Sequence, residues 1–189
     1  MFINGKNIKE YAYATLKALV SIVFQDFTHY AVTLKENITM GDNMRYDELK
    51  LRKIVSQIGL TDLVNKLNHA IETPLGKARE GGVDISGGEW QKIALSRLLY
   101  KCSEINILDE PTASLDPIAE GKVYELFGNI NKDKFTLYIT HRLGAAKIAS
   151  EILVVNNGRI EERGSHDQLM ADSEGLYKKM FENQQSWYS

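Results

Sequence analysis

The most constraining feature of this sequence is an alternation of short apolar runs with longer amphipathic runs in its second half. Apolar runs at Ile105–Leu108, Phe135–Ile139 and Glu151–Val155 predict strands. Asn157-Gly158, just after the last of these runs, predicts a hairpin turn. The amphipathic segments Gly87–Lys101 and Pro117–Ile130 predict helices beside them. Strands separated by helices of this length are typical of a parallel sheet with helices packed on it. We therefore expect an α/β fold with a mostly parallel sheet.

The first half of the chain predicts shorter elements and a helical region. Asn4-Gly5 is typical of a type I′ hairpin turn just after the chain begins. The residues from Ser21 to Phe24 predict a buried strand that ends at Gln25. A helical region is predicted after residue 45, with an interruption at Gly59. Its apolar residues recur at roughly helical spacing: Leu49, Ile54, Ile58, Leu63 and Leu67.

Composition and charge set limits on the kind of protein. The 189 residues suffice for one domain with a real core. A net charge of −2 gives no indication of the positive charge that proteins use to bind nucleic acid or an anionic membrane surface. The single cysteine, Cys102, cannot form an internal disulfide, which favours a reducing compartment. The apolar stretch Leu16–Phe24 is too short to span a bilayer, so we expect a soluble intracellular chain.

The sequence Ser86-Gly87-Gly88-Glu89 opens the longest predicted helix and has two interpretations. As a capping box, Ser86 is the N-cap and Glu89 reaches back to it. That interpretation leaves two glycines in the first turn unexplained, and each glycine in a helix costs about 1 kcal/mol relative to alanine. The glycines are accounted for if a ligand approaches the backbone closely, because amides at a helix start bind phosphate.

Acidic residues follow the apolar strand at Ile105–Leu108. One acid there would simply mark a strand that runs into solvent. Asp109 and Glu110 are adjacent, however, and ligands of parallel α/β sheets bind beyond the carboxyl ends of the strands. One carboxylate can hold Mg²⁺ while the next acts on an attacking water. Asp116-Pro117 is interpreted as the N-cap and first residue of the next helix.

The strand Phe135–Ile139 is followed by Thr140-His141. A histidine at that end of a neighbouring strand reaches the same edge as the acid pair, although a lone histidine is more often a surface or capping residue. The other histidines, His29, His69 and His166, have no partner at metal-ligand spacing.

In their order along the chain, these motifs resemble those of the ATP-binding cassette (ABC) ATPases, from Phe2 onward. "ISGGE" is similar to the signature motif, "INILDEP" to the Walker B strand and "SLD" to the D-loop. His141 matches the switch histidine, and Gln25 matches the Q-loop glutamine. "TPLGKAREGG" and "LKENI" resemble exporter segments that touch the membrane partner, and "GGEWQKIALSR" is similar to bacteriocin and peptide exporters.

The sequence departs from the family pattern in three places. Ile85 replaces the usual Leu, and Glu89 replaces the common Gln, without disturbing the helix start. The third departure is large, because the 189 residues contain no phosphate loop of the form G-x-x-x-x-G-K-[ST] (Walker A). We therefore expect a partial cassette of the P-loop NTPase type whose first strands and phosphate loop are missing, with the adenine-stacking aromatic residue also upstream.

The resemblance implies a domain organisation and a set of site residues. The chain is expected to be one partial ATPase domain, with a helical subdomain at about 35–95 inserted in an α/β core of 1–34 and 96–189. ATP would lie between two cassettes that face head to tail. Residues that bind its γ-phosphate or communicate across that dimer would be Ser86, Gly87, Gly88, Glu89 and Asp116. Gln25 and Asp109 would hold Mg²⁺, Glu110 would be the general base, and His141 would stabilise the transferring phosphoryl group.

The resemblance leaves three functions open. The first is the ATPase subunit of an exporter, or part of that subunit. The second is a soluble ABC protein of DNA maintenance or translation, and the third is a degenerate, non-hydrolytic half-site. The exporter hypothesis implies a transmembrane permease partner, no nucleic acid, and a place at the cytoplasmic face of the membrane. The second predicts a basic face or a coiled-coil insertion, and neither stands between Gln25 and Ser86. Without a phosphate loop, the chain alone is predicted to bind ATP poorly and not to hydrolyse it.

Overall fold

The computed structural model describes residues 1–42, 46–77, 80–130 and 134–185. The chain forms two compact units, Met1–Ile139 and Thr140–Ser189. Within the described ranges, none of the helices is long and apolar enough to cross a bilayer.

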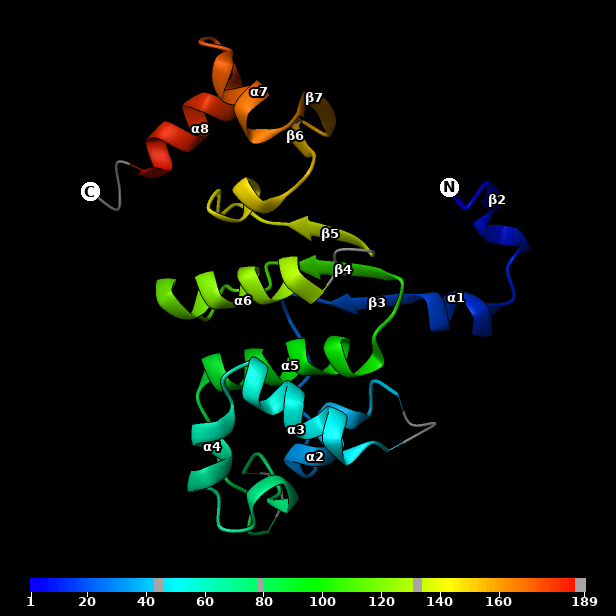
Figure 1. Ribbon diagram of the computed structural model, residues 1–189, viewed down its shortest axis with the longest axis vertical. Coiled ribbons are helices and arrows are strands. Elements are labelled where there is room, and N and C mark those ends of the chain that lie inside the picture. The colour runs from blue at the N-terminus through cyan, green and yellow to red at the C-terminus, as the bar shows by residue number, and fades with distance from the viewer. Residues whose placement is uncertain (43–45, 78–79, 131–133, 186–189) are drawn as a thin grey trace. The chain divides into compact units, whose positions relative to one another are not determined.

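A three-stranded parallel sheet forms the centre of the first unit. Its strands are β3 (Val20–Val23), β4 (Ile105–Asp109) and β5 (Phe135–Ile139), in the order β3-β4-β5. Val23 pairs with Leu108, and Asp109 pairs with Ile139, so the carboxyl ends of all three strands lie at one edge (Figure 1). This confirms the prediction of parallel strands in an α/β fold.

The two faces of this sheet differ in burial. Val23 and Leu108 pack in one core with residues of α5 (Gly87–Lys101) and α6 (Pro117–Ile130). Both helices lie on that face because two right-handed crossovers that step in the same direction place their helices on the same side. The opposite face is exposed, with Ile22 at 46% and Phe24 at 59%. The prediction of a buried strand from Ser21 to Phe24 is therefore wrong at alternate residues.

The helical region packs against α5. It contains α2 (Leu34–Thr39), α3 (Glu48–Gln57), α4 (Thr61–Lys66) and the 3-10 turn η2 (Ala70–Glu72), and Figure 1 shows α2 and α3 beside α5. Gly59 follows α3 with a φ of +72°, a conformation that glycine adopts without a steric penalty. Of the apolar residues at helical spacing, Leu49 is 82% exposed, whereas the other four are buried: Ile54, Ile58, Leu63 and Leu67.

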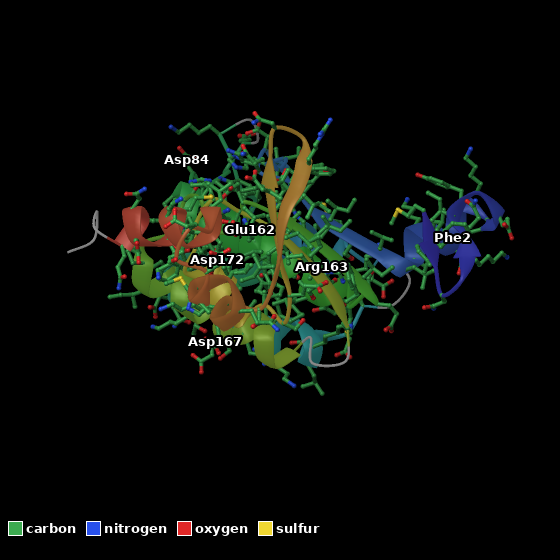
Figure 2. The ribbon with its side chains drawn as sticks, turned by 90° about the horizontal axis from the view of Figure 1, so that it is seen from above. Phe2, Asp84, Glu162, Arg163, Asp167 and Asp172 are labelled. Atoms are coloured by element: carbon green, nitrogen blue, oxygen red, sulfur yellow. The ribbon has the colours of Figure 1, made fainter. Side chains whose placement is uncertain are left out.

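The N-terminal segment forms the predicted hairpin. β1 (Phe2–Ile3) pairs antiparallel with β2 (Lys6–Asn7), and both turn residues have positive φ. The short helices η1 (Ile8–Glu10) and α1 (Tyr13–Leu19) then lead to β3. Phe2, labelled in Figure 2, is exposed on this hairpin.

The second unit has its own small core. It contains η3 (Ala145–Ile148), β6 (Ile152–Asn156), β7 (Arg159–Gly164), α7 (His166–Ala171) and α8 (Leu176–Gln185). β6 pairs antiparallel with β7 across the Asn157-Gly158 turn, which confirms the hairpin predicted there. The two strands form a sheet of their own and do not extend the parallel sheet. Glu162 on β7 (Figure 2) accepts hydrogen bonds from the amides of Leu176 and Tyr177, which joins this hairpin to the start of α8. A carboxylate is favourable there because a helix N-terminus carries partial positive charge.

Candidate functional site

The start of α5 is a complete capping box. Ser86 Oγ accepts a hydrogen bond from Glu89 N at 3.3 Å, and Ser86 N donates to Glu89 Oε2 at 2.8 Å. The predicted cap is confirmed. The box leaves two amides over, because those of Gly87 and Gly88 have no acceptor within the described residues. Gly87 is exposed and Gly88 is half-buried, so the positive end of this 15-residue helix is open to solvent at Gly87.

The two glycines have different environments. A Cβ placed on Gly87 would meet nothing outside its own helix nearer than Ser114 Cβ, at 3.9 Å. A Cβ on Gly88 would lie 3.2 Å from Ser114 O. A contact within the chain therefore accounts in part for Gly88, and no such contact accounts for Gly87. These distances also show that the helix start lies directly against the loop that contains Ser114.

The acid pair ends β4. Asp109 is the half-buried last residue of the strand, and Glu110, 9% exposed, follows it with a φ of +45°. Few residues with a Cβ adopt this left-handed conformation, and such strain is concentrated at functional sites. Hydrogen bonds hold Glu110 there. Its amide donates to Ile139 O at 2.9 Å, and its carbonyl accepts from Ala113 N at 3.2 Å.

Gln91 is a site residue that the sequence reasoning missed. This side chain is 1% exposed. Its Nε2 donates to Glu110 O at 3.2 Å, and its Oε1 accepts from Ser114 N at 2.6 Å. Its position in the sequence could have indicated this role. A glutamine among Ala94, Leu95 and Leu98 on the apolar face of a helix needs buried hydrogen-bond partners.

Asp116 caps α6 as predicted. Its Oδ1 accepts hydrogen bonds from the amides of Ile118 and Ala119, each at 3.0 Å. The amide of Ala119, and then that of Ile118, lower the pKa of the Asp116 carboxyl below its usual value. The residue is exposed, so a charged carboxylate lies at the surface two residues after Ser114.

Gln25 and His141 follow the two outer strands of the sheet. Gln25 is exposed and comes two residues after Val23, the partner of Leu108, so it follows β3 at the same edge where Glu110 follows β4. His141 belongs to the second unit, where its carbonyl accepts from Gln184 Nε2 at 2.8 Å. The described residues contain no group of three or more His, Cys, Asp or Glu that would hold a metal by themselves.

The remaining histidines have local contacts. His29 stacks on Trp90 with ring centroids 4.3 Å apart, and His166 Nδ1 lies 2.8 Å from Tyr177 Oη. His69 donates its amide to Thr73 Oγ1 at 3.0 Å.

The two segments that resemble exporter sequences are joined to each other. Leu34 N donates to Thr73 O at 3.1 Å, and Leu75 N donates to Val32 O at 3.0 Å. Of the "TPLGKAREGG" segment, Ala78 and Arg79 lie outside the described residues.

Arg97 of α5 ties the helical region together. Its guanidinium donates to Asn37 O at 3.0 Å, to Asn37 Oδ1 at 2.8 Å and to Thr28 O at 3.0 Å. Burial lowers the pKa of this group. The same helix therefore positions the Ser86–Glu89 start and the segment that follows Gln25.

Comparison with known proteins identifies the family. The family model described as "ABC transporter" matches residues 1–113, which is more than half of the chain. The chain belongs to the ABC transporter family.

Curated relatives of this ABC chain agree. It is 38% identical over 185 residues to the subtilin transport ATP-binding protein of Bacillus subtilis, covering 97% of this chain and 30% of that protein. It is 36% identical over 167 residues to the nisin transport ATP-binding protein of Lactococcus lactis, covering 88% and 28%. An ATP-dependent lipid A-core flippase of Pectobacterium atrosepticum is 35% identical over 180 residues, covering 95% and 30%. The chain therefore spans about 30% of the length of these relatives.

A solved structure has the same fold. A bacterial Atm1-family ABC exporter with ATP bound superimposes with a TM-score of 0.88 at 30% sequence identity, covering 97% of this chain and 31% of that one.

Proposed function

We propose that this chain is the ATP-binding component, or part of that component, of an ABC exporter. It would contribute its signature motif, Walker B acids, D-loop and switch histidine to an ATP site shared with a second cassette. One observation carries the proposal. The amides of Gly87 and Gly88 have no acceptor within the described residues, and they lie at the start of a 15-residue helix against the loop that follows the acid pair. Such amides are suited to a terminal phosphate.

The residues at the sheet edge fit a magnesium-nucleotide. Asp109 and Gln25 supply the oxygen ligands that Mg²⁺ prefers, and such sites usually take one or two protein ligands, with phosphates and waters as the others. Bound there, Mg²⁺ would neutralise charge that develops on the phosphates.

Glu110 is the proposed general base. It would accept a proton from the water that attacks the γ-phosphate, and its backbone is held on both sides by hydrogen bonds. His141 would donate a hydrogen bond to the transferring phosphoryl group. Asp116, exposed at the start of α6, would face the second cassette beside Ser86.

The proposed partners are a second nucleotide-binding domain and a transmembrane permease at the cytoplasmic face of the membrane. Support comes from the relatives described as nisin and subtilin transport ATP-binding proteins and as a lipid A-core flippase, and from the similar solved structure of an ABC exporter. The paired segments around Leu34 and Thr73 form the proposed surface for the permease.

The proposal is tested at Glu110, in a chain extended upstream with the phosphate-loop region of the subtilin transport relative. Glu110→Gln should slow ATP hydrolysis by roughly 10²–10⁴-fold and spare ATP binding, as expected for loss of a general base. Glu104→Gln is the matched control, because Glu104 is an exposed acid at the other end of β4. Near-normal turnover in Glu110→Gln would remove this residue from the role.

A second candidate is a non-hydrolytic half-site, in which this chain supplies only the start of α5 to a nucleotide that another cassette holds. It predicts that the purified chain neither binds ATP at micromolar concentration nor turns it over. It also predicts that the chain raises the turnover of a relative's nucleotide-binding domain whose own signature serine has been disabled. Saturable ATP binding with turnover by the chain alone would exclude this candidate.

A further inference from the structure

Gln91 connects the helix of the signature motif to the turn that contains the proposed general base. Its side chain bonds Glu110 O at 3.2 Å and Ser114 N at 2.6 Å, and it is 1% exposed. The two partners lie on either side of the same short loop. One side chain from α5 therefore binds this loop at two points.

The orientation of the Gln91 amide follows from its partners. Ser114 N is a donor and requires an oxygen opposite it, whereas Glu110 O is an acceptor and requires an N–H. The reversed amide would place two acceptors together and two donors together. A single rotamer thus satisfies both partners.

The Glu110 turn depends on such contacts because its backbone is strained. Glu110 has a φ of +45°, which is unfavourable for a residue with a Cβ. The bond from Glu110 N to Ile139 O fixes the turn to β5, and the bond from Gln91 fixes it to α5. Strained residues persist only where their surroundings determine the conformation from several directions.

The start of α5 also contacts this loop directly. A Cβ on Gly88 would be 3.2 Å from Ser114 O and 3.6 Å from Leu115 Cδ2. A displacement of the helix start therefore reaches Ser114 along two routes, one through the close backbone contact and one through Gln91. The second route extends directly to the carbonyl of Glu110.

We propose that Gln91 is a positioning residue that couples the start of α5 to the Glu110 turn. When an anion engages the amides of Gly87 and Gly88, Gln91 transmits the resulting shift of α5 to Glu110 O and Ser114 N. The catalytic consequence rests on the proposed ATPase function. The mechanical coupling is a property of this chain and is measurable without nucleotide.

The first test is amide hydrogen exchange in the full chain. Gln91→Met keeps the volume and removes both hydrogen bonds. It should speed exchange at Ser114, Ala113 and Glu110 by roughly three- to tenfold, equivalent to one ordinary hydrogen bond. The amides of Leu95 and Leu98, inside α5, should keep their rates. Gln57→Met, at an exposed glutamine of α3, is the matched control and should change none of these amides.

A conservative variant separates positioning from space filling. In Gln91→Glu, a carboxylate oxygen still accepts from Ser114 N but repels Glu110 O. Exchange should therefore be near normal at Ser114 and fast at Glu110 and Ala113. Protonation makes the carboxyl a donor again, so lowering the pH should restore protection at Glu110 in this variant. If Gln91→Met exchanges like the wild-type chain, or if lowering the pH restores nothing in Gln91→Glu, the proposal is overturned.

Coupling and catalysis have separate readouts. Ser86→Ala should shift the amide resonance of Glu110 in the wild-type chain but not in Gln91→Met, and an equal shift in both backgrounds would refute the coupling. In the upstream-extended chain, Gln91→Met should lower kcat by roughly 10- to 100-fold and leave the KM for ATP unchanged. A change in KM alone would contradict a positioning role. If the extended chain has no turnover, the proposed function fails, while the exchange data still decide the role of Gln91.

Discussion

Replacing Gly87 with alanine distinguishes a glycine retained for a ligand from one required by the fold. Gly87 lies in the first turn of α5 and is not among the residues with positive φ, so an L-residue fits its backbone. The nearest atom outside its own helix would be 3.9 Å from the new Cβ, an ordinary van der Waals contact. The fold alone therefore gives no reason for glycine at this position.

The magnitude follows from the backbone entropy of glycine. A glycine-to-alanine change at a compatible position stabilises a protein by about 0.4–1 kcal/mol, mainly by restricting the unfolded chain. For a chain of this length, that gain raises the melting temperature by about 1–4 °C. Gly88→Ala is the matched comparison. Its Cβ would lie 3.2 Å from Ser114 O, a backbone atom, so the entropy gain should be reduced or reversed.

The assay is urea unfolding followed by tryptophan fluorescence. Trp90 is buried in α5, and a Trp187→Phe background makes it the only tryptophan. Gly87→Ala should move the unfolding midpoint upward, and Gly88→Ala should move it less or in the opposite direction. Because the chain has two compact units, the comparison concerns the transition reported by Trp90 rather than one global free energy.

A destabilising Gly87→Ala would refute this reasoning. Such a result would mean that the fold requires the glycine, and the argument for a ligand at this helix start would lose its basis. The functional counterpart uses the shared-site complementation assay. In that assay, the chain is mixed with a relative's nucleotide-binding domain whose own signature serine has been disabled. Gly87→Ala should reduce the ATP turnover that this chain restores to that domain, although the variant chain itself is more stable.

Two further predictions concern stability. Amides of α6 hold the pKa of the Asp116 carboxyl below its usual value. The charged carboxylate therefore stabilises the fold at any pH above that usual pKa, and this contribution is lost as the pH falls through the lower pKa of the folded state. The difference in urea midpoint between wild type and Asp116→Asn should therefore shrink between about pH 6 and about pH 3, and a constant difference would contradict it. Arg97→Lys should cost about 2–3 kcal/mol in urea unfolding, because lysine cannot make the three bonds of the half-buried guanidinium. Arg52→Lys, at an exposed pair with Glu48, should cost under about 0.5 kcal/mol; equal costs would exclude the explanation.

Local features of the sequence predicted most elements and caps. The Asn4-Gly5 turn, the Ser86–Glu89 capping box and the Asp116 cap depend on residues that are close in the chain, and the structure confirms all three. The same is true of Gly59, whose positive φ ends α3. The roles in nucleotide chemistry stay predictions, because they depend on a second cassette and on ATP.

The sequence by itself determined the approximate positions of most helices and strands, because hydrophobic periodicity and capping are short-range effects. It also determined the order of the motifs, from which the family resemblance followed. Only the tertiary structure decided which face of β3 is covered, that β6 and β7 form a sheet separate from the parallel one, and that Leu49 faces solvent. It alone revealed Gln91, because Glu110 and Ser114 lie 19 and 23 residues away and meet it only when α5 packs on the sheet. The physical reason is the separation along the chain between a polar group and its hydrogen-bond partner. Caps and turns are satisfied within a few residues, whereas a buried amide takes whichever partners the packing of distant elements brings to it.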